Sequence, residues 1–317
     1  MDDVTAAPIR RVAVFIPTLD GARYLDEVLD AVKAQRLDLP FTVRAIDSGS
    51  TDGTQAILAR HEVPFESIDR ATFDHGMTRN RGVLAADADA VALLSQDATP
   101  ADENWLRELL APLRSDASVA GAYARQESRP GAHPFQRVNL ERHMEAAAGA
   151  RVEGPLNVAT YATMSPEARL RAIAFDNVAS VVRTAALRAR PFPKAMFGED
   201  LAWARAILLS GGRIAYCPRA RVLHSHDATP DEFGSRVFAT HQVYKRLADF
   251  TPFPSRLLQV RRTIGQALRL ASAAVRTEDI GLGLRIKALL QALPYAIRQM
   301  EAMRKGALSV AYEPPHQ

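Results

Sequence analysis

The 317-residue sequence contains very little cysteine. A single residue, Cys217, excludes a disulfide framework and fits a reducing compartment. No apolar run reaches the roughly 18 residues that a membrane-spanning helix needs. Residues 1–11 are short of apolar side chains and do not have the pattern of a signal peptide. Because 47% of the residues are apolar, the chain can bury a core, and we expect a soluble, cytoplasmic protein.

Two common phosphate-binding signatures are also missing. The chain has neither the glycine fingerprint of dinucleotide-binding folds nor the phosphate-cradling loop that ends in lysine. The loop at residues 47–54, DSGSTDGT, is instead rich in Gly, Ser and Asp. Such a loop allows a polar ligand to approach the backbone closely.

The hydrophobic pattern of the first half alternates between short buried strands and amphipathic helices. Strands are predicted at residues 12–16, 41–46, 64–68 and 90–95, and helices at 24–35 and 54–60. This alternation predicts an α/β fold with a doubly wound, mostly parallel sheet. Further along, strands are predicted at 119–125, 175–182 and 213–217, and helices at 105–113 and 199–210. Residues 1–232 are expected to form this domain, and residues 233–317 a basic, amphipathic helical extension.

Polar side chains follow three of the predicted strands at the point where each strand ends. They are Pro17-Thr18, Asp47 with Asp52, and Asp97. In a parallel sheet these ends meet at one edge, where open α/β sheets bind their ligands. Acidic loops there suit ribose hydroxyls, base N–H groups and a divalent cation on a diphosphate. The alternative is that these aspartates only form turns by bonding their own backbone.

Five motifs in order carry a resemblance to a known family: VAVFIPT, AIDSGSTDGT, FDHGMTRNRG, LLSQDATP and FGEDLAW. Together they resemble the inverting family 2 glycosyltransferases of the GT-A fold. FDHGMTRNRG joined to QDA is similar to bacterial rhamnosyltransferases that use dTDP-rhamnose. The resemblance covers residues 11–227. It implies transfer of a deoxyhexose, L-rhamnose, from a dTDP-linked donor to a glycan or lipid-linked saccharide in cell-envelope polysaccharide biosynthesis.

The resemblance also assigns residues to the donor and to a metal. The nucleotide sugar is expected to contact Pro17, Thr18, Asp47, Asp52, Arg79, Asn80 and Gln96. Mg²⁺ or Mn²⁺ is expected at Asp97, His224 and His226. The family's usual acidic triplet reads Ser95-Gln96-Asp97 here, with one carboxylate, and glutamine is a weaker, neutral ligand. The two histidines alternate along a strand end and point to opposite sides, so we favour His224. The alternative is a histidine that is only hydrogen-bonded there.

Glu199 and Asp200 begin a predicted helix. Acids at this position commonly cap a helix and complement its dipole, which is the alternative to a catalytic role. The resemblance makes Asp200 the general base, with Glu199 beside it in the catalytic pair. Inverting transfer needs a carboxylate within about 3 Å of the acceptor hydroxyl. The helix N-terminus is expected to keep Asp200 ionised at neutral pH.

The C-terminal segment is basic, although the rest of the chain is not. Residues 251–317 contain ten Lys or Arg and four Asp or Glu, whereas the whole chain has a net charge of +4. Leu257, Leu258, Ile264 and Leu268 fit a helical stripe with arginines outside it. Such helices can contact an anionic membrane peripherally, pack on the catalytic domain or form a homo-oligomer. Nucleic acid is not an expected partner, because the arginines are dispersed and aromatic residues are few.

Two kinds of function remain open at this level. The chain is predicted to be an enzyme, a glycosyltransferase. The alternative is a nucleotide-sugar-binding module with little turnover, which Gln96 in the acidic triplet favours. Asp200, Arg79-Asn80 and the two histidines favour the enzyme.

Overall fold

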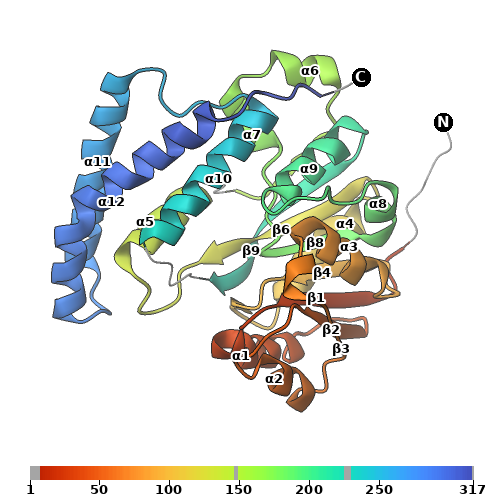
Figure 1. Ribbon diagram of the computed structural model, residues 1–317. Coiled ribbons are helices and arrows are strands. Elements are labelled where there is room, and N and C mark those ends of the chain that lie inside the picture. Colours follow the sequence, from red (N-terminus) through yellow and green to blue (C-terminus); the bar gives the residue numbers. More distant parts are fainter. Residues whose placement is uncertain (1–7, 146–148, 225–229, 316–317) are drawn as a thin grey trace. The chain divides into compact units, whose positions relative to one another are not determined.

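The computed structural model describes residues 8–145, 149–224 and 230–315. The chain forms two compact units. The first consists of residues 1–126, 147–160 and 172–224, and the second of residues 127–146, 161–171 and 225–317. The C-terminal helices of the second unit appear in cyan to blue in Figure 1. Within the described ranges, every helix is too short or too polar to cross a lipid bilayer.

One sheet forms the centre of the first unit. Its strands lie in the order β3-β2-β1-β4-β8-β6-β9-β5, and β7 pairs with β9 outside this path. Their bounds are β1 (Val12–Thr18), β2 (Phe41–Asp47), β3 (Phe65–Ser67), β4 (Ala90–Leu94), β5 (Ala98–Pro100), β6 (Val119–Glu127), β7 (Arg151–Glu153), β8 (Ala179–Arg183) and β9 (Arg213–His224).

The sheet is mixed. β2 pairs in parallel with β1 and β3, and β1 pairs in parallel with β4. The pairings β4–β8, β6–β8, β5–β9 and β7–β9 are antiparallel. The parallel part therefore ends at β4, which is the strand that precedes Asp97. The predicted α/β fold with C-terminal helices is confirmed.

Helices cover both faces of this sheet, which is why its central strands are apolar throughout. On one face Val12, Val14 and Ile16 share a buried cluster with side chains of three helices, namely α1 (Ala22–Lys33), α2 (Thr54–Arg60) and α4 (Trp105–Ser115). On the other face Phe15 lies against Gly82, where an added Cβ would come within 2.2 Å of the phenylalanine ring. This face carries α3 (His75–Leu84), α8 (Thr184–Ala189) and α9 (Glu199–Leu209), and the short helix η1 (Arg70–Thr72) precedes α3.

The strand predicted at residues 175–182 begins later than expected. β8 starts at Ala179, and the preceding residues form a loop. Val178 donates its backbone N–H to Oδ1 of Asp176 over 2.8 Å, which forms the turn that aspartate favours. Asp176 and Asn177 therefore lie in a loop directly before a central strand.

The second unit is helical. It contains α5 (Pro134–Glu145), α10 (Pro230–Ala248), α11 (Arg256–Arg276), α12 (Leu282–Leu308) and nearly all of α7 (Pro166–Ala172). The boundary between the units after residue 160 falls within α6 (Val158–Thr163). α12 packs against α10 and α11, and α5 packs against α11. Gln266 donates to Gln299 over 3.0 Å, and Gln299 donates to Asn139 over 2.9 Å, so a polar network links α11, α12 and α5.

Candidate functional site

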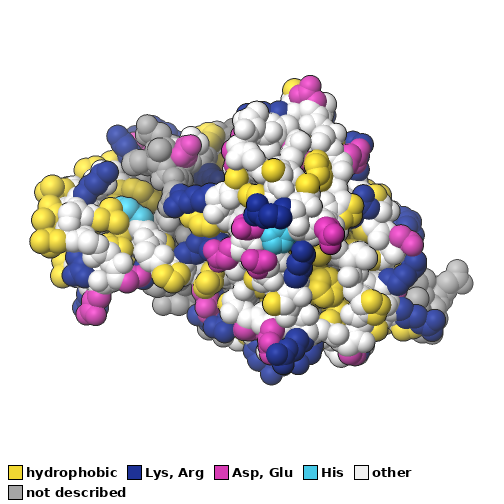
Figure 2. Space-filling model, turned by 90° about the horizontal axis from the view of Figure 1, so that it is seen from below, with side chains coloured by type: hydrophobic (Ala, Val, Ile, Leu, Met, Phe, Trp, Pro, Cys, Tyr) yellow, Lys and Arg dark blue, Asp and Glu magenta, His cyan; other side chains and the backbone are white. Residues whose placement is uncertain are grey.

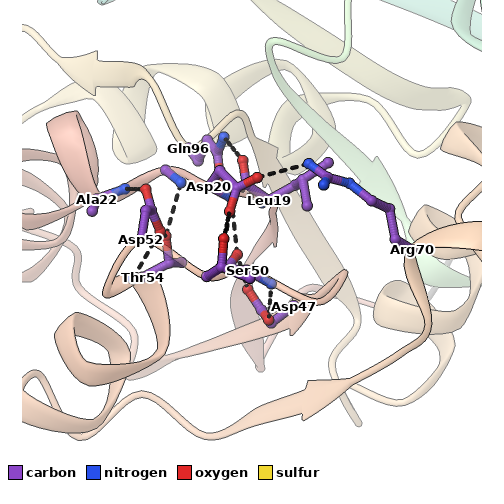
Figure 3. A network of polar contacts seen from close by, with 11 residues as sticks. Leu19, Asp20, Ala22, Asp47, Ser50, Asp52, Thr54, Arg70 and Gln96 are labelled. Atoms are coloured by element: carbon purple, nitrogen blue, oxygen red, sulfur yellow. Dashed lines mark hydrogen bonds and ion pairs between the residues drawn. The ribbon is translucent and has the colours of Figure 1, made fainter.

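Asp47 belongs to a polar network at the ends of β1 and β2, and Figure 3 shows it beside Ser50. Its carboxylate is fully buried and accepts hydrogen bonds from Thr18 Oγ1 at 2.9 Å, Ser50 Oγ at 2.5 Å and Gln55 Nε2 at 2.7 Å. Burial opposes the charged form, but these hydrogen bonds outweigh it and lower the pKa of Asp47. Pro17 lies beside it in β1, opposite Ile46 of β2. An ionised carboxylate is therefore fixed at the edge where the sequence predicts the nucleotide.

Asp52 ties the starts of two helices together. One of its oxygens accepts the backbone N–H of Ala22 at 2.9 Å, and the other accepts from both the backbone N–H and the hydroxyl of Thr54. These contacts, drawn in Figure 3, are those of a turn-forming and capping residue. The predicted contact between Asp52 and the nucleotide stays a prediction.

Gln96 uses both ends of its amide on the backbone of Leu19. Leu19 N–H donates to Gln96 Oε1 at 2.8 Å, and Gln96 Nε2 donates to the Leu19 carbonyl at 2.8 Å. Gly21 is required beside it, because a Cβ there would lie 2.3 Å from Gln96 Oε1. Gln96 thus holds the loop after β1 against the end of β4 (Figure 3), and its predicted contact with the donor stays a prediction.

Arg79 and Asn80 lie on α3 and are both buried. Arg79 Nη1 donates to Glu199 Oε1 at 2.9 Å, and the side chains of this ion pair are 8% and 6% exposed. Asn80 pairs its amide with the backbone N–H and carbonyl of Phe192, at 3.0 and 2.9 Å. These contacts hold α3 to the segment that leads into α9. The donor contacts predicted for Arg79 and Asn80 stay predictions.

Glu199 is held by two donors on the same oxygen. Besides Arg79, the amide of Asn177 donates to Glu199 Oε1 at 3.1 Å. The carboxylate is therefore fixed between α3 and the loop before β8. This geometry is that of a residue that positions its neighbours, and the direct catalytic role predicted for Glu199 stays a prediction.

Asp97 and His224 are brought together, although 126 positions separate them in the sequence. His224 Nε2 lies 3.5 Å from Asp97 Oδ2. On the other side of the ring, Nδ1 lies 2.7 Å from Gln126 Oε1, and Gln126 Nε2 donates to Asp176 Oδ2. Asp97 follows β4, and His224 is the last residue of β9. His226 lies outside the described residues.

Asp200 follows Glu199 and lies in the first turn of α9. Its Oδ1 accepts the backbone N–H of Leu201 at 2.8 Å, and its Oδ2 lies 3.4 Å from the backbone nitrogen of Asn177. Burial, and then the nearby carboxylates of Glu199 and Asp176, raise the pKa of Asp200 well above its ordinary value. Burial and these carboxylates outweigh the backbone hydrogen bond and Arg79, which act in the opposite direction. The expectation that the helix N-terminus keeps Asp200 ionised at neutral pH stays a prediction. A raised pKa makes the carboxylate a stronger base.

The donor set around Asp97 fits a cation shared with a diphosphate. Among the described residues, no group of three or more His, Cys, Asp or Glu side chains is arranged to hold a metal by itself. Mg²⁺ is commonly bound through one or two carboxylates, with waters and substrate phosphates in the remaining positions. Asp97 would supply one such carboxylate, and Nε2 of His224, 3.5 Å from it, would add a nitrogen ligand. Gln96 does not join these two ligands in this geometry, because both ends of its amide are bonded to Leu19.

Two residues of this arrangement were not predicted from the sequence. Gln126 connects His224 to Asp176, and Asp176 contributes to the raised pKa of Asp200. Asp176 had a signal in the dipeptide Asp176-Asn177, a turn-forming pair within a run that was taken for a strand. Gln126 had no such sequence signal, because a single glutamine at the end of a strand belongs to no recognisable motif.

Comparison with known proteins identifies the family. The profile of glycosyl transferase family 2 matches residues 13–186. The chain is 30% identical over 237 residues to an O-antigen chain rhamnosyltransferase of Salmonella typhimurium, covering 73% of this chain and 71% of the relative. It is 29% identical over 233 residues to the corresponding enzyme of Salmonella anatum, covering 72% and 70%.

Solved structures show the same fold at low sequence identity. A mannosyltransferase of Pyrobaculum calidifontis, in complex with GDP-mannose and Mn²⁺, matches with a TM-score of 0.57 and 18% identity, over 96% of this chain and 88% of that one. Glucosyl-3-phosphoglycerate synthase of Mycobacterium tuberculosis, in complex with Mn²⁺ and UDP, matches with a TM-score of 0.54 and 16% identity, over 74% and 79%. The predicted GT-A-type fold is confirmed. The chain belongs to glycosyl transferase family 2 and is a glycosyltransferase.

Proposed function

We propose that this glycosyltransferase moves L-rhamnose from dTDP-rhamnose to a saccharide acceptor with inversion at the anomeric carbon. The observation that carries the proposal is the path from Asp97 through His224, Gln126 and Asp176 to the environment of Asp200. This path joins Asp97, which follows β4, to the ends of β9 and β6, to the loop before β8 and to the start of α9. The similarity to two rhamnosyltransferases supports the choice of sugar.

Asp200 acts as the general base in this proposal. The acceptor hydroxyl attacks the anomeric carbon from the side opposite the diphosphate and gives its proton to the Asp200 carboxylate. A new carbon–oxygen bond forms as the bond to the diphosphate oxygen breaks, and its electrons leave with dTDP. A carboxylate with a raised pKa accepts this proton readily near neutral pH.

In this proposal Asp97 and His224 would hold a divalent cation, Mg²⁺ or Mn²⁺. A cation bound there would supply positive charge beside the departing diphosphate. Asp47, Thr18 and Ser50 form the ionised, hydrogen-bonded edge beside which the nucleoside binds. Glu199 and Arg79 fix the start of α9 and hence the position of Asp200.

The test is a screen of nucleotide sugars with the full chain. Release of nucleoside diphosphate and binding of each donor are measured with Mg²⁺, with Mn²⁺ and with chelator. We expect dTDP-rhamnose to be turned over in the presence of a saccharide acceptor. Asp200→Asn should bind the donor as the wild type does but turn over about 100-fold more slowly or worse. Wild-type turnover in this variant would remove Asp200 from the mechanism.

The alternative, a nucleotide-sugar-binding module, predicts a different outcome of the same screen. It is favoured by Gln96, which replaces an acid of the usual triplet and is bonded to Leu19. Donor binding without release of nucleoside diphosphate, with any acceptor and either metal, would support the module and contradict the transferase.

A further inference from the structure

The C-terminal helices expose an unusual amount of apolar surface. Eleven of the eighteen large hydrophobic side chains that are exposed among the described residues lie between positions 257 and 297. On α11 they are Leu257, Val260, Ile264, Leu268 and Val275, and on α12 they are Leu282, Ile286, Leu289, Leu290, Leu293 and Ile297. Leu257, Leu282 and Leu290 are each more than 70% exposed. Figure 2 shows hydrophobic side chains gathered at the left-hand end of the view, where these helices lie. A contiguous apolar surface of this kind marks an interaction site.

The packing of α12 is reversed relative to an ordinary amphipathic helix in water. Its buried positions include Ala288, Ala292 and Ala296, which join Leu270 and Ala274 of α11 in one cluster. Small residues spaced four apart form one side of the helix and allow close packing against its neighbours. The larger leucines and isoleucines point outward. In an ordinary amphipathic helix, the side that faces water is polar and the large apolar side chains face the protein core.

The exposed residues of α11 form one stripe. Leu257, Val260, Ile264, Leu268 and Val275 follow helical spacing and lie within about 60° of one direction at 3.6 residues per turn. Arg262, Arg269 and Arg276 recur every seven residues, are exposed, and lie about 100° or more to one side of it. Arg261, which is also exposed, lies at the margin of the stripe, within about 60° of its direction. On α12 the exposed Lys287 and Arg298 lie outside the apolar stripe. Each helix thus presents an apolar stripe beside a row of positive charge.

We propose that α11 and α12 lie on the surface of an anionic lipid bilayer, with their apolar stripes inserted between the headgroups. Leucine-rich stripes beside basic residues are typical of helices that bind in the plane of a membrane. The positive rows suit anionic lipids. A second copy of the chain would bring equally basic surfaces together, which makes it the weaker choice of occupant. The inference does not depend on the proposed sugar, donor or base.

The apolar stripes separate this proposal from attraction by charge alone. Salt screens the contribution of the basic residues but not that of buried leucines. We therefore expect binding to vesicles of phosphatidylcholine with phosphatidylglycerol to be strong at low salt and to persist in part at high salt. Binding to vesicles of phosphatidylcholine alone is expected to be weaker.

The experiment is co-sedimentation of the full chain with these vesicles, using two matched variants. Leu290→Gln with Leu293→Gln removes two side chains that are 74% and 52% exposed. Leu84→Gln with Val152→Gln removes two that are 43% and 49% exposed in the first unit. The first variant should lose about tenfold or more of its partition into anionic vesicles, and the second should bind as the wild type does. Circular dichroism confirms that both remain folded.

Three outcomes would overturn the proposal. The first is a folded wild-type protein that ignores anionic vesicles at low salt. The second is equal loss of binding in both variants. The third is a dimer in solution, measured by light scattering without lipid, that Leu290→Gln with Leu293→Gln converts to a monomer, because the stripes would then be covered by a second copy.

Discussion

His224 and Gln126 are joined by a hydrogen bond of 2.7 Å that determines which nitrogen of the neutral histidine ring carries the proton. The amide nitrogen of Gln126 donates to Asp176, so its oxygen is the atom that faces His224. An amide oxygen only accepts, and His224 Nδ1 must therefore carry the proton. In the neutral ring the other nitrogen, Nε2, then has its lone pair directed to the side of Asp97, which lies 3.5 Å away. Gln126 thus selects the form of His224 that can bind a metal.

Removal of this bond should weaken metal binding without removing either ligand. We expect Gln126→Leu to lower the affinity for Mn²⁺, measured with dTDP present by electron paramagnetic resonance, by about 10-fold or more. The ¹⁵N shifts of His224 should also change from one tautomer to a mixture in the variant without metal. This readout separates a positioning role from a general loss of structure.

The control for Gln126 is a glutamine in the second unit. Gln242 lies on α10 and donates to Ser309 over 3.0 Å. Gln242→Leu should leave Mn²⁺ binding unchanged. An unchanged Mn²⁺ affinity and an unchanged His224 tautomer in Gln126→Leu would show that Gln126 does not position the ring.

Asp97 should matter for the nucleotide only when a cation is present. Asp97→Ala is expected to weaken binding of dTDP in Mg²⁺ or Mn²⁺ by about 10-fold, and to change it little in chelator, because the carboxylate acts on the diphosphate through the metal. Calorimetric titration under both conditions measures this difference. Equal losses with and without metal would mean that Asp97 supports the loop after β4 and not a cation.

An acid at position 96 should not rebuild a metal site. The carboxylate of Gln96→Asp has no N–H to donate to the Leu19 carbonyl, and it is one methylene shorter than the glutamine side chain. The Leu19 carbonyl therefore loses its partner, and the Leu19 N–H can lose its partner as well. We expect the free energy of unfolding to fall by about 1–3 kcal/mol and Mn²⁺ affinity to stay the same. Urea unfolding and Mn²⁺ titration measure the two effects. Tighter Mn²⁺ binding at wild-type stability would show that the pairing with Leu19 is dispensable and that the triplet is a metal site.

Local pattern was sufficient for most of the fold. The helix at Thr54–Arg60 was predicted to the residue, and β1, β2 and β4 were predicted within two residues of their bounds. These strands are buried on both faces, and such apolar runs are recognisable without tertiary information. Strands of the antiparallel half were predicted at residues 119–125, 175–182 and 213–217, but their antiparallel direction was not. These strands are joined by irregular segments, and their direction depends on pairings such as Ala92 with Val181, which leave no local signal.

The sequence named candidate residues but not the contacts between them. Its motifs single out Asp97, Asp200 and His224 as candidates, and their roles stay predictions, whereas Gln126 and Asp176 became visible only through contacts across the fold. The charge of Asp200 shows the same limit. The sequence contains the helix start, which favours ionisation, and the neighbouring Glu199, which opposes it. The largest effect is burial, and Asp176, which lies 24 positions earlier, adds to it, so neither could be predicted from the local sequence.

The raised pKa of Asp200 predicts how stability depends on pH. The folded state binds this proton more tightly than the unfolded chain does, so the contribution of Asp200 is favourable at low pH and is lost as pH rises from about 4 through the folded pKa. Asparagine cannot ionise. Asp200→Asn should therefore gain stability relative to the wild type as pH rises, by at most about 1.4 kcal/mol per pH unit, until the folded pKa is passed.

Urea unfolding of Asp200→Asn at pH 5, 6, 7 and 8 measures this trend, and Asp52→Asn is the matched control. Hydrogen bonds from Thr54 and Ala22 outweigh burial and lower the pKa of Asp52. Its ionised form therefore stabilises the fold above pH 4, and this contribution is lost as pH falls through the lowered pKa. Asp52→Asn should be less stable than the wild type throughout this range, with little dependence on pH. A constant difference between Asp200→Asn and the wild type from pH 5 to 8 would place the pKa of Asp200 near its ordinary value. The carboxylate would then lack the raised basicity that the proposed mechanism uses.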